Sequence, residues 1–258
     1  MYPARWDRNP RSRRAGRAVL RPHFEEIDRR PTPLGEITVR RRLEPTLQVD
    51  VYEVKLGDEF LMSSLFTVAE IALADLALAE LPGDRLDVVV GGLGLGYTAT
   101  AVLRDRRVRS VRVVEALRAV IEWHQGNLLP LASGITSDPR CQLIHADFFA
   151  TLADGSMLDP GSPERFHALL VDIDHSPRHL LHPSHAGFYE NAGLRRVVER
   201  LHPGGVFALW ADGRPDDDFV AAVERSFAAC VANVVTFPNF YTGGESSSTV
   251  YVATTEPG

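Results

Sequence analysis

A glycine-rich stretch follows the apolar run 86–90, and it contains Gly91, Gly92, Gly94 and Gly96. Glycine adopts backbone angles that are closed to other residues, and it lets a ligand lie directly against the main chain. Glu115 ends the next apolar run and lies 23 residues after Gly92. An acid about 20 residues after such a loop accepts hydrogen bonds from ribose hydroxyls in dinucleotide-binding sites. These residues therefore predict a nucleoside site in which the glycines and Glu115 contact the ligand.

Further acids follow two other runs that are typical of buried strands. Asp172 lies near the end of the run 168–173, and Asp174 comes two residues later. Open α/β sheets bind ligands at the carboxyl ends of their strands, and a carboxylate there can hold a cation or accept a proton from an ammonium group. We therefore expect Asp172 and Asp174 to be catalytic, although Asp172 could instead cap the following segment. Asp147 follows the run 142–146 and is expected to bind adenine, to cap a short helix, or both.

Four of the nine histidines lie within the 11 residues from His175 to His185. Their spacing resembles that of metal ligands, but Pro177 and Pro183 interrupt any single helix and no cysteine is nearby. We therefore expect no metal site and interpret the stretch as a loop over the active site. Its imidazoles, His175 among them, can assist proton transfer near neutral pH. The alternative is a polar, mobile lid.

The elements that position these residues alternate between strands and helices after residue 83. Five buried strands, at 88–90, 111–115, 142–146, 168–173 and 206–210, are each followed by a helical or loop segment. Two more strands, at 231–237 and 249–254, have no room for a helix between them. This pattern predicts an α/β fold with a doubly wound, Rossmann-like, seven-stranded sheet whose last strand is antiparallel.

The chain before this sheet has a different pattern. Polar and apolar residues alternate through 36–40, 47–54 and 59–62, which predicts a small N-terminal β-hairpin module. A helix over 65–80 connects it to the glycine loop and carries Glu70, which either contacts substrate or lies in solvent. Order is expected to begin near Gly35. We therefore divide the chain into an Arg-rich disordered tail (1–30), the hairpin module with its helix (31–82) and a nucleoside-binding catalytic domain (83–258).

Composition excludes several classes of function. No apolar stretch approaches the length of a membrane span, and the N-terminus lacks the apolar segment of a secretion signal, so a cytoplasmic location is expected. The net charge is −6, but residues 1–45 hold 12 arginines against 6 acids, which leaves an acidic body. This balance argues against nucleic acid as the partner of the folded domain and suits a cationic substrate. Cys141 and Cys230 are expected to be buried thiols.

With these segments in order, the chain resembles the spermidine synthase family of polyamine aminopropyltransferases from about Leu47 to the C-terminus. The resemblance rests on the glycine loop 89–96, the acid-ended strands 111–115 and 143–147, Leu170-Val-Asp172, and Phe188-Tyr-Glu190 with Leu201-His-Pro-Gly-Gly205. It implies decarboxylated S-adenosylmethionine (AdoMet) as co-substrate, a small amine as acceptor and a homodimer. It also implies that Glu115 holds the ribose, Asp147 lies beside adenine, Asp172 serves in catalysis, and Tyr189 contacts substrate.

The chain departs from the family pattern at two positions. Gly94 stands where the family's loop places an Asp that binds the amine of the co-substrate, and His175 stands where a second catalytic Asp is usual. Two alternatives therefore remain open. One is methyl transfer from S-adenosylmethionine itself, although Val90 occupies the position where many methyltransferases have an acid. The other is a non-catalytic nucleoside-binding protein.

Overall fold

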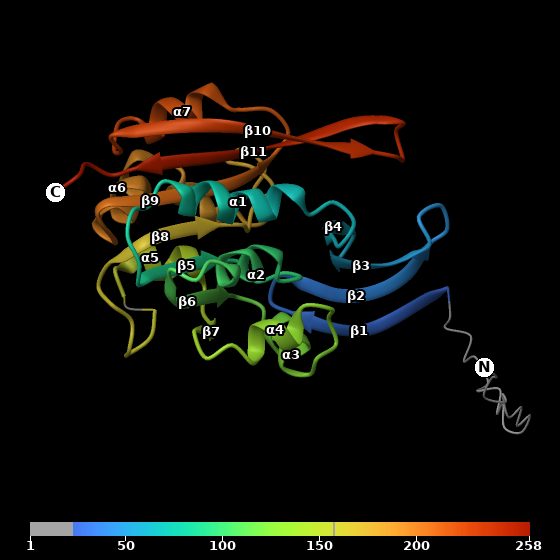
Figure 1. The fold of residues 1–258 in the computed structure, drawn as a ribbon. Helices are drawn as coiled ribbons and strands as arrows, with labels where there is room; N and C mark the ends of the chain where they lie inside the picture. The colour runs from blue at the N-terminus through green and yellow to red at the C-terminus, as the bar shows by residue number, and fades with distance from the viewer. Residues whose placement is uncertain (1–22, 157) are drawn as a thin grey trace, which may run out of the picture.

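A computed structural model describes residues 23–156 and 158–258 of the chain. These residues form two sheets that lie against each other (Figure 1). One is a four-stranded antiparallel sheet in the order β1-β2-β3-β4, and the other has seven strands in the order β10-β11-β9-β8-β5-β6-β7. In the described part of the chain, no helix combines the length and the apolar character that crossing a membrane requires.

The N-terminal sheet is built from strands with alternating exposure. Its strands are β1 (Phe24–Thr32), β2 (Gly35–Glu44), β3 (Val49–Leu56) and β4 (Glu59–Ser63). On β2, Ile37 and Val39 are fully buried while the residues between and after them are partly exposed, as expected for a sheet with one covered face. Gly57 has a φ of +57° and turns the chain between β3 and β4.

Strand β1 corrects the sequence analysis, because order begins at Phe24 and not near Gly35. The expected tail 1–30 is therefore wrong for residues 24–30, and residues 1–22 lie outside the described part. β1 has a weak apolar pattern, and it combines pairing with the next strand with side-chain contacts to residues more than 90 positions away. It pairs along its length with β2, and Asp28 accepts a hydrogen bond from the indole nitrogen of Trp123 at 2.6 Å. Arg30 forms an ion pair with Glu122.

The seven-stranded sheet agrees with the prediction. Its strands are β5 (Leu86–Gly91), β6 (Val108–Glu115), β7 (Cys141–His145), β8 (Phe166–Val171), β9 (Leu201–Asp212), β10 (Ala229–Asn239) and β11 (Gly244–Thr254). Strands β5 to β9 are parallel to one another, and β11 is antiparallel to both β9 and β10. The mixed seven-stranded sheet with its last strand antiparallel is therefore confirmed.

Helices cover both faces of this sheet. One face carries α1 (Val68–Ala79), α2 (Tyr97–Arg104), α3 (Arg118–Gln125) and α4 (Ala132–Thr136). The other carries α5 (Phe148–Asp154), the 3-10 helix η1 (Pro183–Phe188), α6 (Asn191–Glu199) and α7 (Asp217–Val223). Successive strand residues enter opposite layers, since Val88 and Val90 belong to the first core and Val89 to the second.

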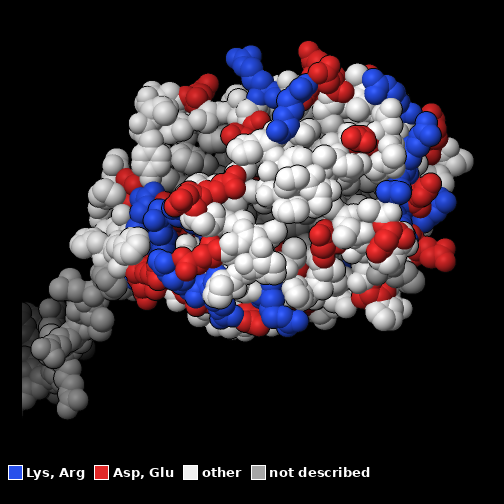
Figure 2. All heavy atoms as spheres, turned by 180° about the vertical axis from the view of Figure 1, so that it is seen from behind, with Lys and Arg blue, Asp and Glu red and all other residues white. Residues whose placement is uncertain are grey.

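The N-terminal sheet shares the first of these cores. Its buried residues Ile37, Val39, Val54 and Leu56 pack in one cluster with Leu73 of α1. This packing holds the four-stranded sheet next to the carboxyl ends of the parallel strands. Figure 2 shows the opposite side of the molecule, where acidic and basic side chains are intermixed around a largely uncharged middle.

The two cysteines are partly exposed in this fold, where the sequence analysis expected buried thiols. Cys141 begins β7, whereas Cys230, which the sequence analysis placed at a helix end, lies in β10. Neither forms a disulfide. Burial raises the pKa of the Cys141 thiol to about 12 and that of Cys230 to about 11, so both remain protonated near neutral pH.

Candidate active site

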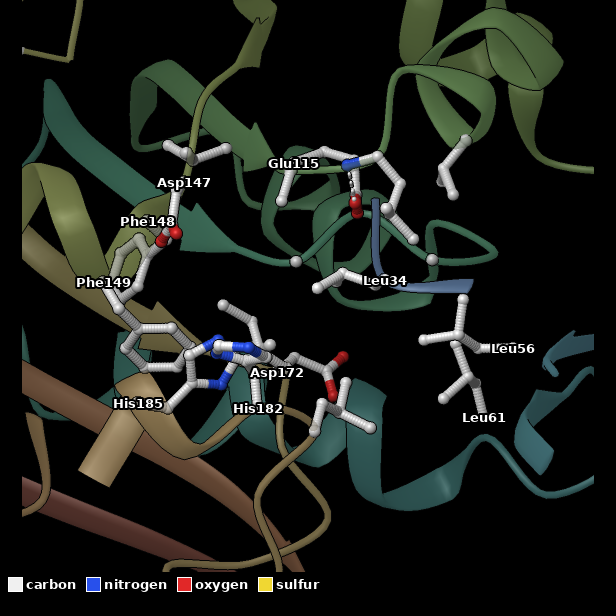
Figure 3. Close-up of a pocket in the computed structure, with 18 of the residues that line it drawn as sticks. Leu34, Leu56, Leu61, Glu115, Asp147, Phe148, Phe149, Asp172, His182 and His185 are labelled. Atoms are coloured by element: carbon white, nitrogen blue, oxygen red, sulfur yellow. Dashed lines mark hydrogen bonds between the residues drawn. The ribbon is translucent and has the colours of Figure 1, made fainter. Parts of the chain in front are cut away.

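A cavity of about 430 Å³ opens where the N-terminal sheet meets the carboxyl ends of β5, β6, β7 and β8. Its polar side chains come mostly from the large sheet and the segments that follow its strands: Glu115, Asp147, Asp172, His175, His182 and His185. One wall is apolar and comes from the N-terminal sheet: Leu34, Ile37, Val54, Leu56, Leu61 and Met62. In Figure 3, Leu56 and Leu61 lie at the opposite end from Phe148 and Phe149. The cavity is large enough for a nucleoside-sized ligand.

The glycine loop places two of its four glycines on the cavity. Gly92 and Gly94 line it, with φ values of +93° and +46°. A Cβ atom at Gly92 would overlap the backbone carbonyl oxygen of Asp172, so only glycine allows β5 and β8 to end this close together. Gly91 and Gly96 do not line the cavity. A Cβ at Gly91 would lie 2.9 Å from the Phe148 ring, and Gly96 precedes α2 with a φ of +90°.

Protein atoms already occupy the space beside Gly94. A Cβ added there would overlap the terminal methyl group of Met62 and lie 2.6 Å from its sulfur. The amide of Leu95 lies 3.1 Å from the same sulfur. On the other side of the loop, the Gly94 carbonyl accepts a hydrogen bond from Nε2 of buried His124 at 2.9 Å. The position of the missing acid is therefore filled by an apolar thioether from β4.

Glu115 points from the end of β6 into the cavity, beside the glycine loop (Figure 3). Its carboxylate accepts hydrogen bonds from the amides of Leu93 at 3.0 Å and Leu117 at 2.8 Å. Desolvation raises the pKa of Glu115, while these amides act in the opposite direction. The Gly94 amide also donates to this carboxylate. A carboxylate has about four lone-pair sites, so three amide bonds still leave capacity for a ligand hydroxyl.

Asp147 lies beyond β7 and lines the cavity next to Phe148 (Figure 3). Its side chain accepts a hydrogen bond from the amide of Ala150 at 3.0 Å and caps the N-terminus of α5. The expected capping role is therefore present. One oxygen makes this bond, so the carboxylate can cap the helix and face a ligand at the same time.

Asp172 follows β8 and faces the cavity (Figure 3). Thr98, near the start of α2, donates its hydroxyl proton to Oδ2 of Asp172 at 2.7 Å. Burial raises the pKa of Asp172 from 3.8 to about 6, and the Thr98 hydrogen bond opposes this shift. Glu70 on α1 does not line the cavity but lies behind Asp172. Burial and the charge of Asp172 raise the pKa of Glu70 from 4.5 to about 8.

These two carboxyl groups form an acid pair with unequal proton affinity. Repulsion between like charges in a buried site favours one proton shared by the pair near neutral pH. The Thr98 hydrogen bond favours the ionised form of Asp172, so the proton resides mainly on Glu70. The arrangement leaves Asp172 as a carboxylate that can accept a proton inside the cavity.

Asp174 was expected to be catalytic and Tyr189 to contact substrate, but both lie behind the cavity wall. Asp174 is 1% exposed. It accepts hydrogen bonds from the Tyr189 hydroxyl at 2.8 Å and the Leu181 amide at 2.8 Å, and Nδ1 of His185 lies 2.8 Å from its carboxylate. Through these bonds Asp174 fixes the loop that presents His182 and His185 to the cavity.

The histidine-rich stretch forms a loop and a 3-10 helix at the cavity, as expected. His175, His182 and His185 line the cavity, and the His185 ring lies 4.1 Å from that of Phe149 between centroids. His175 also approaches Glu59 of β4, with 3.1 Å between Nε2 and the carboxylate. The expected site residues therefore separate into a cavity-lining group and a supporting group behind it.

Sequence reasoning missed four residues of this site: Thr98, Met62, Glu59 and Trp210. Thr98 closely follows the glycine loop, but nothing in the sequence connects it to Asp172, 74 residues away. Trp210 lines the cavity, and its indole nitrogen is buried without a hydrogen-bond partner in the described chain. Such a donor is costly to bury unless a water or ligand accepts from it.

Comparisons with known proteins agree with the motif resemblance. No family model matches the chain. It is 29% identical over 164 residues to polyamine aminopropyltransferase 2 of Pseudomonas aeruginosa, a match that covers 60% of this chain and 43% of that relative. The chain thus spans less than half the length of the curated relative that it matches.

Solved structures show the same fold over most of the chain. A spermidine synthase bound to the transition-state analogue AdoDATO superposes with a TM-score of 0.69 at 16% identity, over 89% of this chain and 73% of that one. Spermidine synthase from Thermotoga maritima gives a TM-score of 0.68 at 16% identity, over 89% and 72%. The resemblance to the spermidine synthase-like aminopropyltransferases is therefore confirmed: the chain has the spermidine synthase fold and sequence similarity to a polyamine aminopropyltransferase.

Proposed function

We propose that the chain is a transferase that binds an AdoMet-type nucleoside in this cavity and moves its aminopropyl group to a small amine. One observation carries the proposal: Asp172, a buried carboxylate with a proton-accepting role available to it, shares the cavity with Gly92 and Glu115. The similarity to polyamine aminopropyltransferase 2 supports it. Decarboxylated S-adenosylmethionine is the co-substrate in this proposal.

The nucleoside half of the ligand would lie along the ends of β5, β6 and β7. Glu115 accepts hydrogen bonds from the ribose hydroxyls, the backbone at Gly92 and Gly94 contacts the ligand directly, and Asp147 with Phe148 borders the base. These residues suit a nucleoside because Glu115 retains free acceptor capacity and Gly92 has no side chain that would keep the ligand from the backbone. The unpartnered Trp210 indole is a further donor available to the ligand.

The transfer step needs little from the protein beyond alignment and one proton acceptor. The acceptor nitrogen forms a bond to the carbon beside the sulfonium, the carbon–sulfur bond breaks, and its electron pair remains on sulfur as a neutral thioether. The attacking amine must first lose its ammonium proton. Asp172 receives that proton, Thr98 orients the carboxylate, and protonated Glu70 prevents a second negative charge behind it.

The groups behind the cavity wall position the residues that line the cavity. Asp174 and Tyr189 act through His185 and the loop rather than by touching the reacting atoms. His175 and His182 line the cavity and are available to relay a proton to solvent.

A homodimer and a cytoplasmic location are part of the proposal. The homodimer rests on the resemblance, and the location rests on composition.

One observation favours methyl transfer from S-adenosylmethionine as the second candidate. Met62 occupies the space beside Gly94, so no loop acid binds the amine of a decarboxylated co-substrate. The two candidates share the nucleoside and differ at its other end. Affinity for methylthioadenosine therefore cannot separate them, whereas the carboxylated and decarboxylated sulfonium compounds can.

The deciding experiment compares both sulfonium compounds by calorimetry and analyses products with putrescine or spermidine as acceptor. We expect tighter binding of the decarboxylated compound and an aminopropylated product. Asp172→Asn should abolish turnover while methylthioadenosine still binds, and Asp154→Asn, at an exposed carboxylate on α5, serves as the matched control. Preference for S-adenosylmethionine without aminopropylated product would favour methyl transfer. Binding without any turnover would favour a non-catalytic protein.

A further inference from the structure

Three side chains converge at the rim of the cavity, and only one of them, His175, has a part in the proposed reaction. Glu59 comes from β4, and His175 and His179 come from the loop after β8. Oε1 of Glu59 lies 3.1 Å from Nε2 of His175 and 3.5 Å from Nε2 of His179. One atom from each residue lies within 4.8 Å of the others. The cluster therefore joins two parts of the chain that are more than 110 residues apart.

The loop holds the two imidazoles on one side without help from Glu59. Ser176 and His179 form a tight two-way backbone bridge, with N–O distances of 3.2 and 3.1 Å. This turn contains Pro177 and Arg178, and Arg178 is anchored to Asp216. The sequence analysis regarded the proline as an interruption of a ligand helix. Here it lies in the turn that brings the two rings to 4.7 Å between centroids.

Two of the three spacings suit a tetrahedral ion, and the third, between the two imidazoles, is within 4.8 Å. Zinc binds imidazole nitrogen and carboxylate oxygen at about 2.0–2.2 Å, which places neighbouring ligand atoms of a tetrahedron about 3.3–3.5 Å apart. The two contacts of Glu59, at 3.1 and 3.5 Å, lie close to this range. Two imidazoles and one carboxylate suit a first-row transition ion better than Mg²⁺ or Ca²⁺, which prefer all-oxygen sets.

We propose that Glu59, His175 and His179 form a binding site for a transition-metal ion of the Zn²⁺ class. The three side chains leave the fourth position to water, as in other sites with two histidines and one glutamate. The ion can enter from solvent, because the His179 side chain is 67% exposed and that of Glu59 is 38% exposed.

Such an ion would tie the N-terminal sheet to the loop over the cavity. His175 lines the cavity and lies three residues after Asp172, so the ion fixes one edge of the pocket. A bound ion would occupy Nε2 of His175 and leave the proton relay to His182. The nucleoside contacts proposed for Gly92 and Glu115 do not involve the three metal ligands.

The test titrates the chelator-treated full chain with zinc chloride by calorimetry and repeats the titration with Co²⁺, whose absorption reports tetrahedral coordination. We expect one equivalent to bind. At known metal sites, removing a residue that only hydrogen-bonds to a metal ligand costs about 10–100-fold in metal affinity. Glu59→Gln and His179→Ala remove direct ligands, so each should weaken binding at least about 10-fold. His23→Ala, at an exposed histidine before β1, is the matched control and should bind as the wild type does.

Two results would overturn the proposal: no saturable binding at one equivalent by the wild type, or equal affinities in the wild type, both ligand variants and the control. His179→Gln provides a second variant, because its exposed side chain contributes little to folding. Methylthioadenosine affinity, measured in the presence of chelator, reports the nucleoside site separately. The metal site and the transferase proposal can therefore fail independently.

Discussion

The buried acid pair makes the free energy of unfolding fall as pH rises, and we expect Glu70→Gln to reduce this fall. In the folded chain, burial and the nearby Asp172 raise the pKa of Glu70 from 4.5 to about 8. The folded protein therefore holds this proton more tightly than the unfolded chain does. The free energy of unfolding falls as pH rises from 4.5 to about 8. Above that range Glu70 is ionised in both states and no longer makes the free energy of unfolding depend on pH. Glutamine carries no titrating proton and removes this contribution.

The magnitude follows from the size of the shift. One pKa unit corresponds to 1.36 kcal/mol, so a shift of about 3.5 units gives at most about 5 kcal/mol over the whole range. Asp172, with a pKa of about 6, contributes its own loss at lower pH. Between about pH 6.5 and 8 most of the remaining change belongs to Glu70, and it amounts to about 2 kcal/mol.

The assay is urea unfolding at several pH values in this range, followed by fluorescence and circular dichroism. We expect the wild type to lose about 2 kcal/mol that Glu70→Gln retains. Glu80→Gln, at an exposed position at the end of the same helix, should behave like the wild type. Equal pH slopes in wild type and Glu70→Gln would refute the reasoning, because Glu70 would then be ionised in the folded protein at neutral pH.

Three further predictions concern Glu115 and the glycine loop. Glu115→Ala should weaken methylthioadenosine binding by about 1.5–3 kcal/mol in calorimetry, the range for hydrogen bonds to a charged group, and unchanged affinity in a folded variant would contradict its ribose role. Gly92→Ala should lower the free energy of unfolding by at least about 1–3 kcal/mol, since its Cβ meets the Asp172 carbonyl at a φ of +93°; stability equal to the wild type would show that the loop can relax. Gly94→Asp with Met62→Ala should bind decarboxylated S-adenosylmethionine about 1.5–3 kcal/mol more tightly than the wild type, while Gly94→Asp alone should gain less because Met62 occupies the space, and equal gains would contradict that steric argument.

Much of the cavity could be predicted because the responsible residues are close in sequence or occupy fixed places in a repeating pattern. One continuous stretch of sequence contains β5, the glycine loop and Glu115. The parallel pairing of β5, β6, β7 and β8 brings Asp147 and Asp172 to the same edge of the sheet as Glu115. The alternation of buried apolar runs with helical segments likewise predicted the sheet, and the lack of room for a helix between 231–237 and 249–254 predicted its antiparallel strand. Strand β1 escaped because its few apolar residues make a weak period, and because the side chains that anchor it, Trp123 and Glu122, lie more than 90 residues away.

The sequence by itself thus determined the elements, their order and the edge of the sheet where ligands bind, since these depend on local propensity and on the period of apolar residues. Only the tertiary structure decided which carboxylates face the cavity. Asp172 and Asp174 are two residues apart, yet one lines the cavity and the other is buried against Tyr189 and His185. It also decided that Glu70 lies behind Asp172 and that Met62 fills the space beside Gly94. Such contacts depend on the packing of distant segments, which no local pattern encodes.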